Sequence, residues 1–246
     1  MNKPSNITNN DWKLLSEIYK DKEQYLKNML KKNYPIQYLI GYVNFYGIKI
    51  NVNKFVLIPR FETELLVDKT INYIKELNIN NPTILDMGTG SGCIAIALKQ
   101  NIPNSNITAI DISSKALSIA KDNANQNKQN IIFKKENIIK LKKLSYYDVI
   151  ISNPPYIAFG EVVDIQTKYE PRKALYADNE GLLFYQQILE KADQNTKLIA
   201  LEIGETQGES IAKIAKERFP MAKVIIEKDF TNRDRFIFII NIKGEI

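Results

Sequence analysis

The sequence predicts an α/β fold in which a mostly parallel sheet carries helices on both faces. From Pro82 onward, short runs rich in Ile, Val and Leu alternate with longer segments of helical spacing, and two of the runs stop at a glycine-rich or proline-rich corner. Parallel neighbours need long crossovers, so this alternation is typical of such a sheet. The 246 residues, with 44% hydrophobic content, suffice for one large domain and a small additional unit.

The segment before this alternation is expected to divide into helices and a hairpin. Apolar residues after Asn10 recur at helical spacing, which predicts one or two amphipathic helices that end near Gly41. Residues 42–52 alternate in polarity like a short hairpin, and residues 62–77 favour a helix. We therefore expect a small helical N-terminal domain at 1–41, a β-hairpin linker at 42–58 and the main domain at 59–246.

The sheet is expected to form from short apolar runs. These are residues 83–86, 108–111, 131–135, 147–152, 197–204, 223–227 and 235–240. The last two resemble a terminal hairpin-type pair. Between Ile157 and Asp178 lies a longer irregular segment, which is a natural place for a loop that grips a substrate.

A glycine-rich turn follows the first strand and opens an apolar helix. It comprises Gly88, Thr89, Gly90, Ser91 and Gly92. Glycines let a backbone approach a ligand closely. Asp86 just before the turn would repel a phosphate but attract a cation or an amine, and no Lys follows the glycines, which argues against a P-loop.

A second acidic residue favours an adenosyl ligand. Asp111 ends the next strand roughly 20 residues on, where adenosine-binding α/β folds hold a ribose. S-adenosylmethionine fits both acids, with its ribose at Asp111 and its amino-acid end near Asp86. After the third strand, Asn137 could bond the adenine edge and Ile138 could pack on its face; a polar loop with one core isoleucine explains them equally well.

A rigid corner after the strand at 147–152 can hold a planar amide or amine. It consists of Asn153, Pro154, Pro155 and Tyr156. The prolines remove two backbone donors and restrict the residue before each one to extended conformations. The carbonyls therefore point in fixed directions as acceptors, beside one amide side chain and one ring. An isolated Asn-Pro is more often a simple turn, but the upstream glycine-rich motif favours the chemical interpretation.

Composition narrows the chemistry further. The chain has no histidine and one cysteine, Cys93, which excludes an internal disulfide and argues against most zinc and iron sites. Without histidine the usual general base is missing, and methyl transfer from a sulfonium needs none. The net charge of +6 would suit an acidic partner such as nucleic acid. A composition bias toward Lys, Asn and Ile explains it at least as well, and most of the lysines are then expected to form a solvated face. Neither a signal peptide nor a membrane-spanning run is present, so we expect a cytoplasmic protein.

With these residues assembled, the chain resembles the HemK/PrmC family of peptide chain release factor glutamine methyltransferases. The likeness extends from Pro35 to Arg235. Besides the glycine-rich turn, Asp111 and the corner, it is carried by residues 35–41, 45–47, 56–64, 170–171, 174–175, 180–182 and 202–204. The corner alone is shared with adenine- and guanine-amino methyltransferases, whereas the block at 58–64 is much more specific.

The resemblance implies a class I S-adenosylmethionine-dependent methyltransferase. Its Rossmann-like, seven-stranded sheet would be mostly parallel with a reversed last strand, behind an N-terminal domain shorter than is usual. The target would be the side-chain amide nitrogen of the Gln in the Gly-Gly-Gln (GGQ) motif of release factors. S-adenosylhomocysteine would be the product, with no metal, no membrane and no nucleic acid required, and the protein would be a monomer.

Carried over by position, Gly88 to Gly92, Asp111 and Ile138 would line the cofactor site, and Asn153 to Tyr156 would hold the glutamine. The Asn153 side-chain oxygen and the Pro154 carbonyl would each accept one N–H of the target amide at about 3 Å. Asn153 would thus border both cofactor and substrate. Two positions depart from the family pattern: Phe61 stands where proline is usual, and Asn137 where an acid is common.

Two other interpretations share these features. An enzyme that methylates an exocyclic amine of DNA or RNA would present the same planar nitrogen by base flipping. The chain has no obvious separate nucleic-acid recognition domain, which argues against it. A non-catalytic S-adenosylmethionine-binding protein is the third interpretation, and the intact turn, acid and corner argue against that one.

Overall fold

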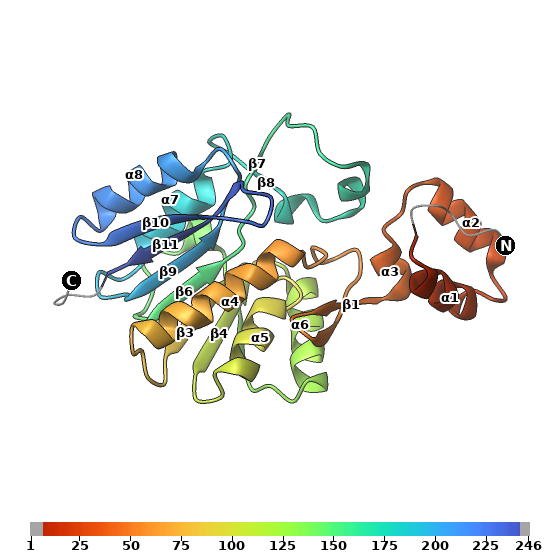
Figure 1. Ribbon diagram of the computed structural model, residues 1–246, viewed down its shortest axis with the longest axis horizontal. Helices are drawn as coiled ribbons and strands as arrows, with labels where there is room; N and C mark the ends of the chain where they lie inside the picture. The colour runs from red at the N-terminus through yellow and green to blue at the C-terminus, as the bar shows by residue number, and fades with distance from the viewer. Residues whose placement is uncertain (1–6, 242–246) are drawn as a thin grey trace.

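A seven-stranded sheet forms the centre of the molecule, as a computed structural model that describes residues 7–241 shows (Figure 1). Its strand order is β10-β11-β9-β6-β3-β4-β5. The strands are β3 (Thr83–Met87), β4 (Asn106–Asp111), β5 (Ile132–Lys135), β6 (Val149–Ser152), β9 (Leu198–Glu202), β10 (Lys223–Lys228) and β11 (Asp234–Ile240). Only β11 runs against the others, because it pairs antiparallel with both β9 and β10. The expected sheet with a reversed last strand is confirmed.

Helices cover both faces of this sheet (Figure 1). One apolar cluster joins the sheet to α4 (Phe61–Glu76), α5 (Cys93–Asn101) and α6 (Ser114–Gln126), and the other joins it to α7 (Leu183–Lys191) and α8 (Gly208–Arg218). Successive residues of one strand, such as Ile84 and Leu85, belong to opposite clusters because side chains alternate along a strand. Among residues 7–241, no helix combines the length and apolarity that a bilayer crossing requires.

Three short helices precede the main domain, where the sequence predicted one or two. They are α1 (Asn9–Ile18), α2 (Glu23–Lys31) and α3 (Ile36–Ile40). Asn33, with a φ of 56°, and Pro35 separate the last two, since proline cannot continue a helix. Leu15, Leu26 and Leu39 form their small core, against which Trp12 packs. Gly41 ends α3 in the left-handed region with a φ of 90°, as predicted.

The predicted hairpin consists of β1 (Tyr42–Phe45) and β2 (Ile48–Asn51), which pair antiparallel. One buried amide, that of Asn123 on α6, holds the hairpin on the main domain. Its Oδ1 accepts from the Asn51 N–H at 2.9 Å, and its Nδ2 donates to the carbonyls of Asn51 at 3.0 Å and Ser91 at 2.9 Å. The linker and the glycine-rich turn therefore share one anchor.

The segment between Ile157 and Asp178 contains only short elements, in agreement with its predicted irregularity. They are β7 (Ile157–Ala158), η2 (Ile165–Tyr169), η3 (Arg172–Ala174) and β8 (Tyr176–Ala177); a further short turn, η1 (Ile138–Lys140), follows β5. Tyr169 donates a hydrogen bond to the Lys32 carbonyl at 2.7 Å and meets the ring of Tyr34 edge-on. The segment thus connects the main domain to the N-terminal helices.

Replacing Asn123 by Ala should lower the free energy of unfolding by about 3 kcal/mol, because the three hydrogen bonds of this buried amide would be lost. Urea denaturation measures this change. Asn125→Ala, at an exposed position of the same helix, serves as the control and should change the stability little. Equal stability of the two variants would contradict the anchoring role of Asn123.

Candidate active site

The predicted site residues meet at one edge of the sheet. Strands β6, β3 and β4 are parallel neighbours in that order. Their carboxyl ends therefore lie side by side, and ligands of open α/β sheets bind outside that edge. Asn153 follows β6, the turn at Gly88 follows β3, and Asp111 ends β4. The turn thus lies between the predicted ribose ligand and the predicted substrate corner.

The glycine-rich turn is fixed against its neighbours by its backbone. Gly88, Gly90 and Gly92 all have positive φ, at 77°, 55° and 84°, a region that glycine enters without steric cost. The N–H groups of Gly88 and Thr89 both donate to the Ile110 carbonyl, at 2.9 and 3.0 Å. A Cβ at Gly92 would lie 3.1 Å from the Cβ of Ala120 on α6. Glycine at that position is therefore needed for the close packing of α5 and α6.

Asp86 is fully buried beneath the turn and incompletely satisfied. Its Oδ2 accepts from the Thr89 hydroxyl at 2.6 Å, whereas within residues 7–241 its Oδ1 has no hydrogen-bond partner. Burial raises the pKa of this carboxyl to about 7, while hydrogen bonds from the Thr89 hydroxyl and the Ala95 backbone act in the opposite direction. A buried acceptor without a donor is costly to leave unmatched. The position therefore fits the ammonium group of an amino-acid ligand.

Asp111 is engaged by backbone N–H groups at both carboxylate oxygens. Oδ2 accepts from Gly90 at 3.0 Å and Oδ1 from Ser113 at 2.8 Å. Burial raises its pKa, and these hydrogen bonds oppose the rise. Each oxygen of an ionised carboxylate can accept more than one hydrogen bond. Asp111 can therefore hold the turn and still receive a pair of hydroxyl groups.

Asn137 and Ile138 follow β5, close to Asp111. The Glu136 N–H donates to the Asp111 carbonyl at 3.1 Å. The Asn137 Oδ1 accepts from the Ile139 N–H at 3.0 Å and so caps the short turn η1. Ile138 is buried in the apolar cluster on the α7 side of the sheet. Both residues thus have structural roles, and their predicted contact with a base stays a prediction.

Hydrogen bonds hold the Asn-Pro-Pro-Tyr corner at its start and at its end. The Ser152 hydroxyl donates to the Met87 carbonyl at 2.6 Å and thereby joins the ends of β6 and β3. The buried amide of Gln207 donates to the carbonyls of Tyr156 and Glu180, at 3.0 and 3.1 Å. Gly181 lies so close that a Cβ there would overlap the Tyr156 carbonyl and the Gln207 amide. The corner therefore has little freedom to move.

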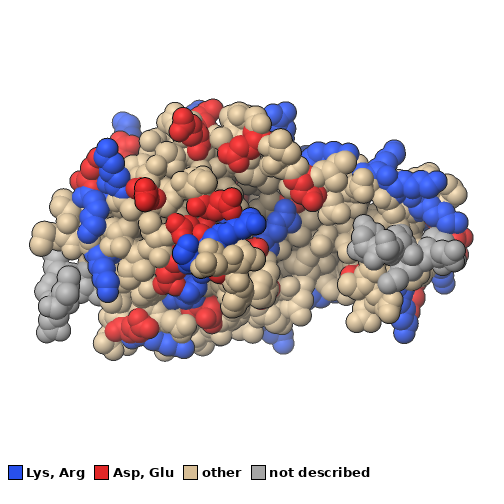
Figure 2. Space-filling model, turned by 45° about the horizontal axis from the view of Figure 1, so that its top comes forward, with Lys and Arg blue, Asp and Glu red and all other residues tan. Residues whose placement is uncertain are grey.

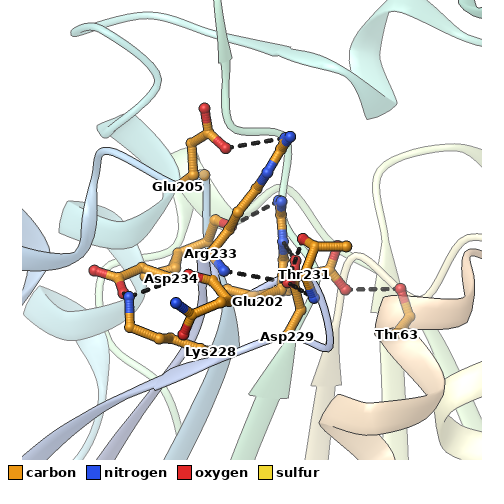
Figure 3. A network of polar contacts seen from close by, with 12 residues as sticks. Thr63, Glu202, Glu205, Lys228, Asp229, Thr231, Arg233 and Asp234 are labelled. Atoms are coloured by element: carbon orange, nitrogen blue, oxygen red, sulfur yellow. Dashed lines mark hydrogen bonds and ion pairs between the residues drawn. The ribbon is translucent and has the colours of Figure 1, made fainter.

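The side chain of Asn153 belongs to a chain of hydrogen bonds that ends on a buried carboxylate. Its Nδ2 donates to the Thr63 hydroxyl at 2.9 Å. That hydroxyl donates to Glu202 Oε2 at 2.7 Å (Figure 3). Burial raises the pKa of Glu202 to about 7, while Thr63, Arg235 and Asn153 act in the opposite direction. Beside Glu202, the turn between β10 and β11 carries further ion pairs, including Arg233 with Glu205 (Figure 3).

A cavity of about 250 Å³ opens in front of this chain. Its lining consists of Leu57, Arg60, Asn153, Tyr156, Ile157, Val163, Asp164, Thr167, Ala174, Leu175 and Glu202. Pro154, which is buried, and the half-buried Pro155 do not line it. A larger polar hollow of about 400 Å³, between the linker and α6, contains none of the predicted site residues.

One wall of this cavity is the irregular segment at 157–178, and an ion pair holds it in place. Arg60 contacts Glu170 at 2.5 Å, and the other Glu170 oxygen accepts from the Ile58 N–H at 3.2 Å. The Glu170 side chain is 1% exposed, so this pair is shielded from solvent on its acidic side. The segment predicted to grip a substrate thus faces Asn153 across the cavity.

On the face that Figure 2 shows, charge is mixed rather than separated by sign. Figure 2 shows acidic and basic side chains side by side on the main domain, with lysines along the outer edge of the N-terminal helices. This distribution agrees with the interpretation of most lysines as a solvated face.

The sequence singled out the Asn-Pro-Pro-Tyr corner but assigned no role to Thr63, Glu202 or Gln207. A signal for one of them was present, because Glu202 ends an apolar strand on a carboxylate, as Asp111 does. Thr63 lies in the specific block at 58–64, but like Gln207 it is a polar residue near the start of a helix and has no chemical signal of its own.

Comparison with known proteins identifies close relatives. Residues 63–169 match the methyltransferase small domain family. The release factor glutamine methyltransferase of Lactococcus lactis is 40% identical over 240 residues, which cover 95% of this chain and 84% of the relative. That of Flavobacterium psychrophilum is 41% identical over 217 residues, which cover 85% of this chain and 76% of the relative.

Solved structures show the same fold at low identity. A methyltransferase from Pyrococcus furiosus has a TM-score of 0.54 at 20% identity, with 91% of this chain and all of the other (100%) covered. A magnesium protoporphyrin IX methyltransferase from Synechocystis with bound S-adenosylmethionine has a TM-score of 0.50 at 14% identity. The match covers 97% of this chain and 100% of the other. Both likenesses concern the architecture alone and support a class I methyltransferase fold.

Replacing Gly181 by Ala should destabilise the protein by about 2 kcal/mol more than replacing Gly160, because the added methyl group overlaps the corner. Both glycines have positive φ, at 82° and 97°, but a Cβ at Gly160 would meet no atom within 4 Å. Gly160→Ala thus controls for backbone strain alone. Chemical denaturation of both variants measures the difference in the free energy of unfolding. Equal losses of stability would show that the corner accommodates the added methyl group at little cost.

Proposed function

This chain belongs to the family of release factor glutamine methyltransferases, and we propose that it methylates the side-chain amide nitrogen of the Gln in the GGQ motif of peptide chain release factors. The observation that carries the proposal is the position of Asn153. It lines a cavity of about 250 Å³ and follows the strand next to the one that ends in the glycine-rich turn. A cavity of that size accommodates one extended side chain.

The residues around the turn fit S-adenosylmethionine. The unmatched Asp86 Oδ1 and the backbone of Gly88 to Gly92 would bind its amino-acid end. Asp111 would accept the ribose hydroxyl groups, and Asn137 and Ile138 would border the adenine. When bound, the cofactor supplies a methyl group on a sulfonium, whose C–S bonding pair stays on sulfur in the product S-adenosylhomocysteine.

Asn153 and Pro154 would orient the target nitrogen. The Asn153 Oδ1 and the Pro154 carbonyl each accept one N–H of the substrate amide, which leaves the face of the nitrogen open toward the cofactor. The amide nitrogen forms the new bond to the methyl carbon and gains positive charge, which both acceptors stabilise. The nitrogen then loses one proton to solvent.

Tyr156 would act by packing. Its ring lines the cavity, and burial raises the pKa of its phenol to about 12. The phenol therefore stays protonated near neutral pH and takes no proton from the substrate. Its role is to cover the amide plane and to exclude water.

The whole of this site comes from one chain, so the proposed reaction needs no second copy of the protein, and we infer that a monomer suffices. Since release factors act during translation, the proposed reaction takes place in the cytoplasm. No nucleic acid is required for it.

Labelled methyl transfer from S-adenosylmethionine tests the function. We expect label on purified release factor, and none on a factor whose GGQ glutamine is replaced by alanine, because the accepting nitrogen is then missing. Total RNA and DNA are assayed in parallel. Label on nucleic acid alone would favour an exocyclic-amine methyltransferase, and bound cofactor with no label anywhere would favour a binding protein.

Replacing Asp111 by Ala should weaken cofactor binding about 10- to 100-fold, the range expected when hydrogen bonds to a charged group are lost. Isothermal titration with S-adenosylmethionine measures the dissociation constant. Asp122→Ala, at an exposed position of α6, is the control and should bind normally. An unchanged constant in the Asp111 variant would remove the ribose assignment.

A further inference from the structure

We propose that Thr63 and Glu202 are positioning residues that fix which way the Asn153 amide faces, so that its oxygen and not its nitrogen meets the substrate. This inference rests on the proposed function, because an amide substrate needs an acceptor at that point. Thr63 does not line the cavity and acts through Asn153, whereas Glu202 lines the cavity and also accepts the Thr63 hydrogen bond.

Three elements that are distant in sequence bring the residues together. Asn153 directly follows β6, and Glu202 is the last residue of the parallel neighbour β9, where Ser152 pairs with Leu201. Thr63 lies in the first turn of α4, which begins at Phe61. Glu202 is further held through its backbone carbonyl, which accepts from the buried Tyr185 hydroxyl at 3.0 Å. The three side chains are therefore placed by the sheet and its covering helix.

The donor and acceptor of each hydrogen bond in the series Asn153–Thr63–Glu202 follow from a count of protons. A threonine hydroxyl has one proton to donate, whereas an ionised carboxylate, the form of Glu202 at pH values above its pKa of about 7, can only accept. Because Thr63 gives its proton to Glu202 at 2.7 Å, its oxygen can act only as an acceptor toward Asn153. Asn153 must then present its NH₂ group to Thr63, as the 2.9 Å contact shows. The Asn153 Oδ1 is thereby turned away from Thr63.

The opposite orientation of the amide would be penalised. Rotating the Asn153 amide by half a turn would place its Oδ1 against the Thr63 oxygen with no proton between them. The same rotation would present an NH₂ group to the substrate, where two N–H groups await acceptors. Thr63 and Glu202 are only 3% and 2% exposed, so water cannot readily relieve the mismatch. Burial thus makes one orientation strongly preferred.

The same helix offers a matched control. Thr70 lies two turns beyond Thr63 on α4 and is likewise buried, at 0% exposure. Its hydroxyl donates to the Leu66 carbonyl of the same helix at 2.6 Å. Thr70→Val therefore removes a buried hydroxyl from α4 without affecting Asn153, and it reports the purely structural effect of such a change.

The kinetic test compares Thr63→Val, Thr63→Ser and Thr70→Val with the wild type. Valine keeps the shape of threonine but removes the hydroxyl. We expect Thr63→Val to lower kcat for methylation of release factor about 10- to 100-fold, the range for a misplaced reacting group. KM for the factor and the affinity for S-adenosylmethionine should change less than about threefold, because neither depends mainly on the orientation of the Asn153 amide. Thr63→Ser should restore most of kcat, and Thr70→Val should keep it.

A second measurement, NMR of the side-chain amide, reports the orientation of Asn153 independently of enzymatic activity. In protein labelled with ¹⁵N-asparagine, the side-chain NH₂ signals of Asn153 are assigned by their loss in Asn153→Ala. We expect slow hydrogen exchange of one Nδ2 proton in the wild type and in Thr63→Ser, and faster exchange in Thr63→Val. Exchange of the Asn123 NH₂ group, which bonds elsewhere, is the internal reference and should not change.

The outcomes separate the two proposals. Unchanged kcat together with unchanged Asn153 exchange in Thr63→Val would overturn the positioning role. A loss of kcat that Thr70→Val reproduces would also overturn it, because the effect would then be structural. If the wild type methylates no release factor, the proposed function fails, and the exchange of Asn153 still decides whether Thr63 orients the amide.

Discussion

The parallel register of β9, β6, β3 and β4 is the constraint on which the rest of the molecule depends. These strands end at the same edge, and each is completed or followed there by a polar group: Glu202, Asn153, the glycine-rich turn and Asp111. A change of register by one residue would turn every side chain of the shifted strand to the opposite face. The glycine-rich turn, the Asn-Pro-Pro-Tyr corner and the buried carboxylate are therefore positioned together, by the same apolar side chains that form the core.

Much of the fold and part of the site follow from local sequence. The strands of the sheet, the stop at Gly41 and the hairpin at 42–52 all have short-range signatures, since periodicity and turn residues are properties of neighbouring positions. The same holds for the glycine-rich turn, whose positive φ values at Gly88, Gly90 and Gly92 need glycine. Phe61 illustrates a local departure: it takes the first position of α4, where proline is favoured, and stacks on Phe230 instead.

The remainder depends on contacts that no local pattern contains. Thr63 and Glu202 are 139 residues apart in the chain, and Arg60 and Glu170 are 110 apart. Which polar residue meets which is decided only after the sheet has formed. The three N-terminal helices show the same limit on a smaller scale, because the periodicity of residues 9–40 is compatible with fewer, longer helices. The break between α2 and α3 falls at Asn33 and Pro35, on either side of Tyr34, which packs against the small core that includes Leu39.

The position of Trp12 has an optical consequence. It is the only tryptophan among 246 residues, whereas tyrosines are spread through the chain, and it packs on the core of the three N-terminal helices. Fluorescence excited selectively at the indole therefore reports on those helices alone, while circular dichroism is dominated by the sheet and its covering helices. Comparing the two signals during unfolding would separate the cooperativity of the small helical unit from that of the main domain, with no label introduced.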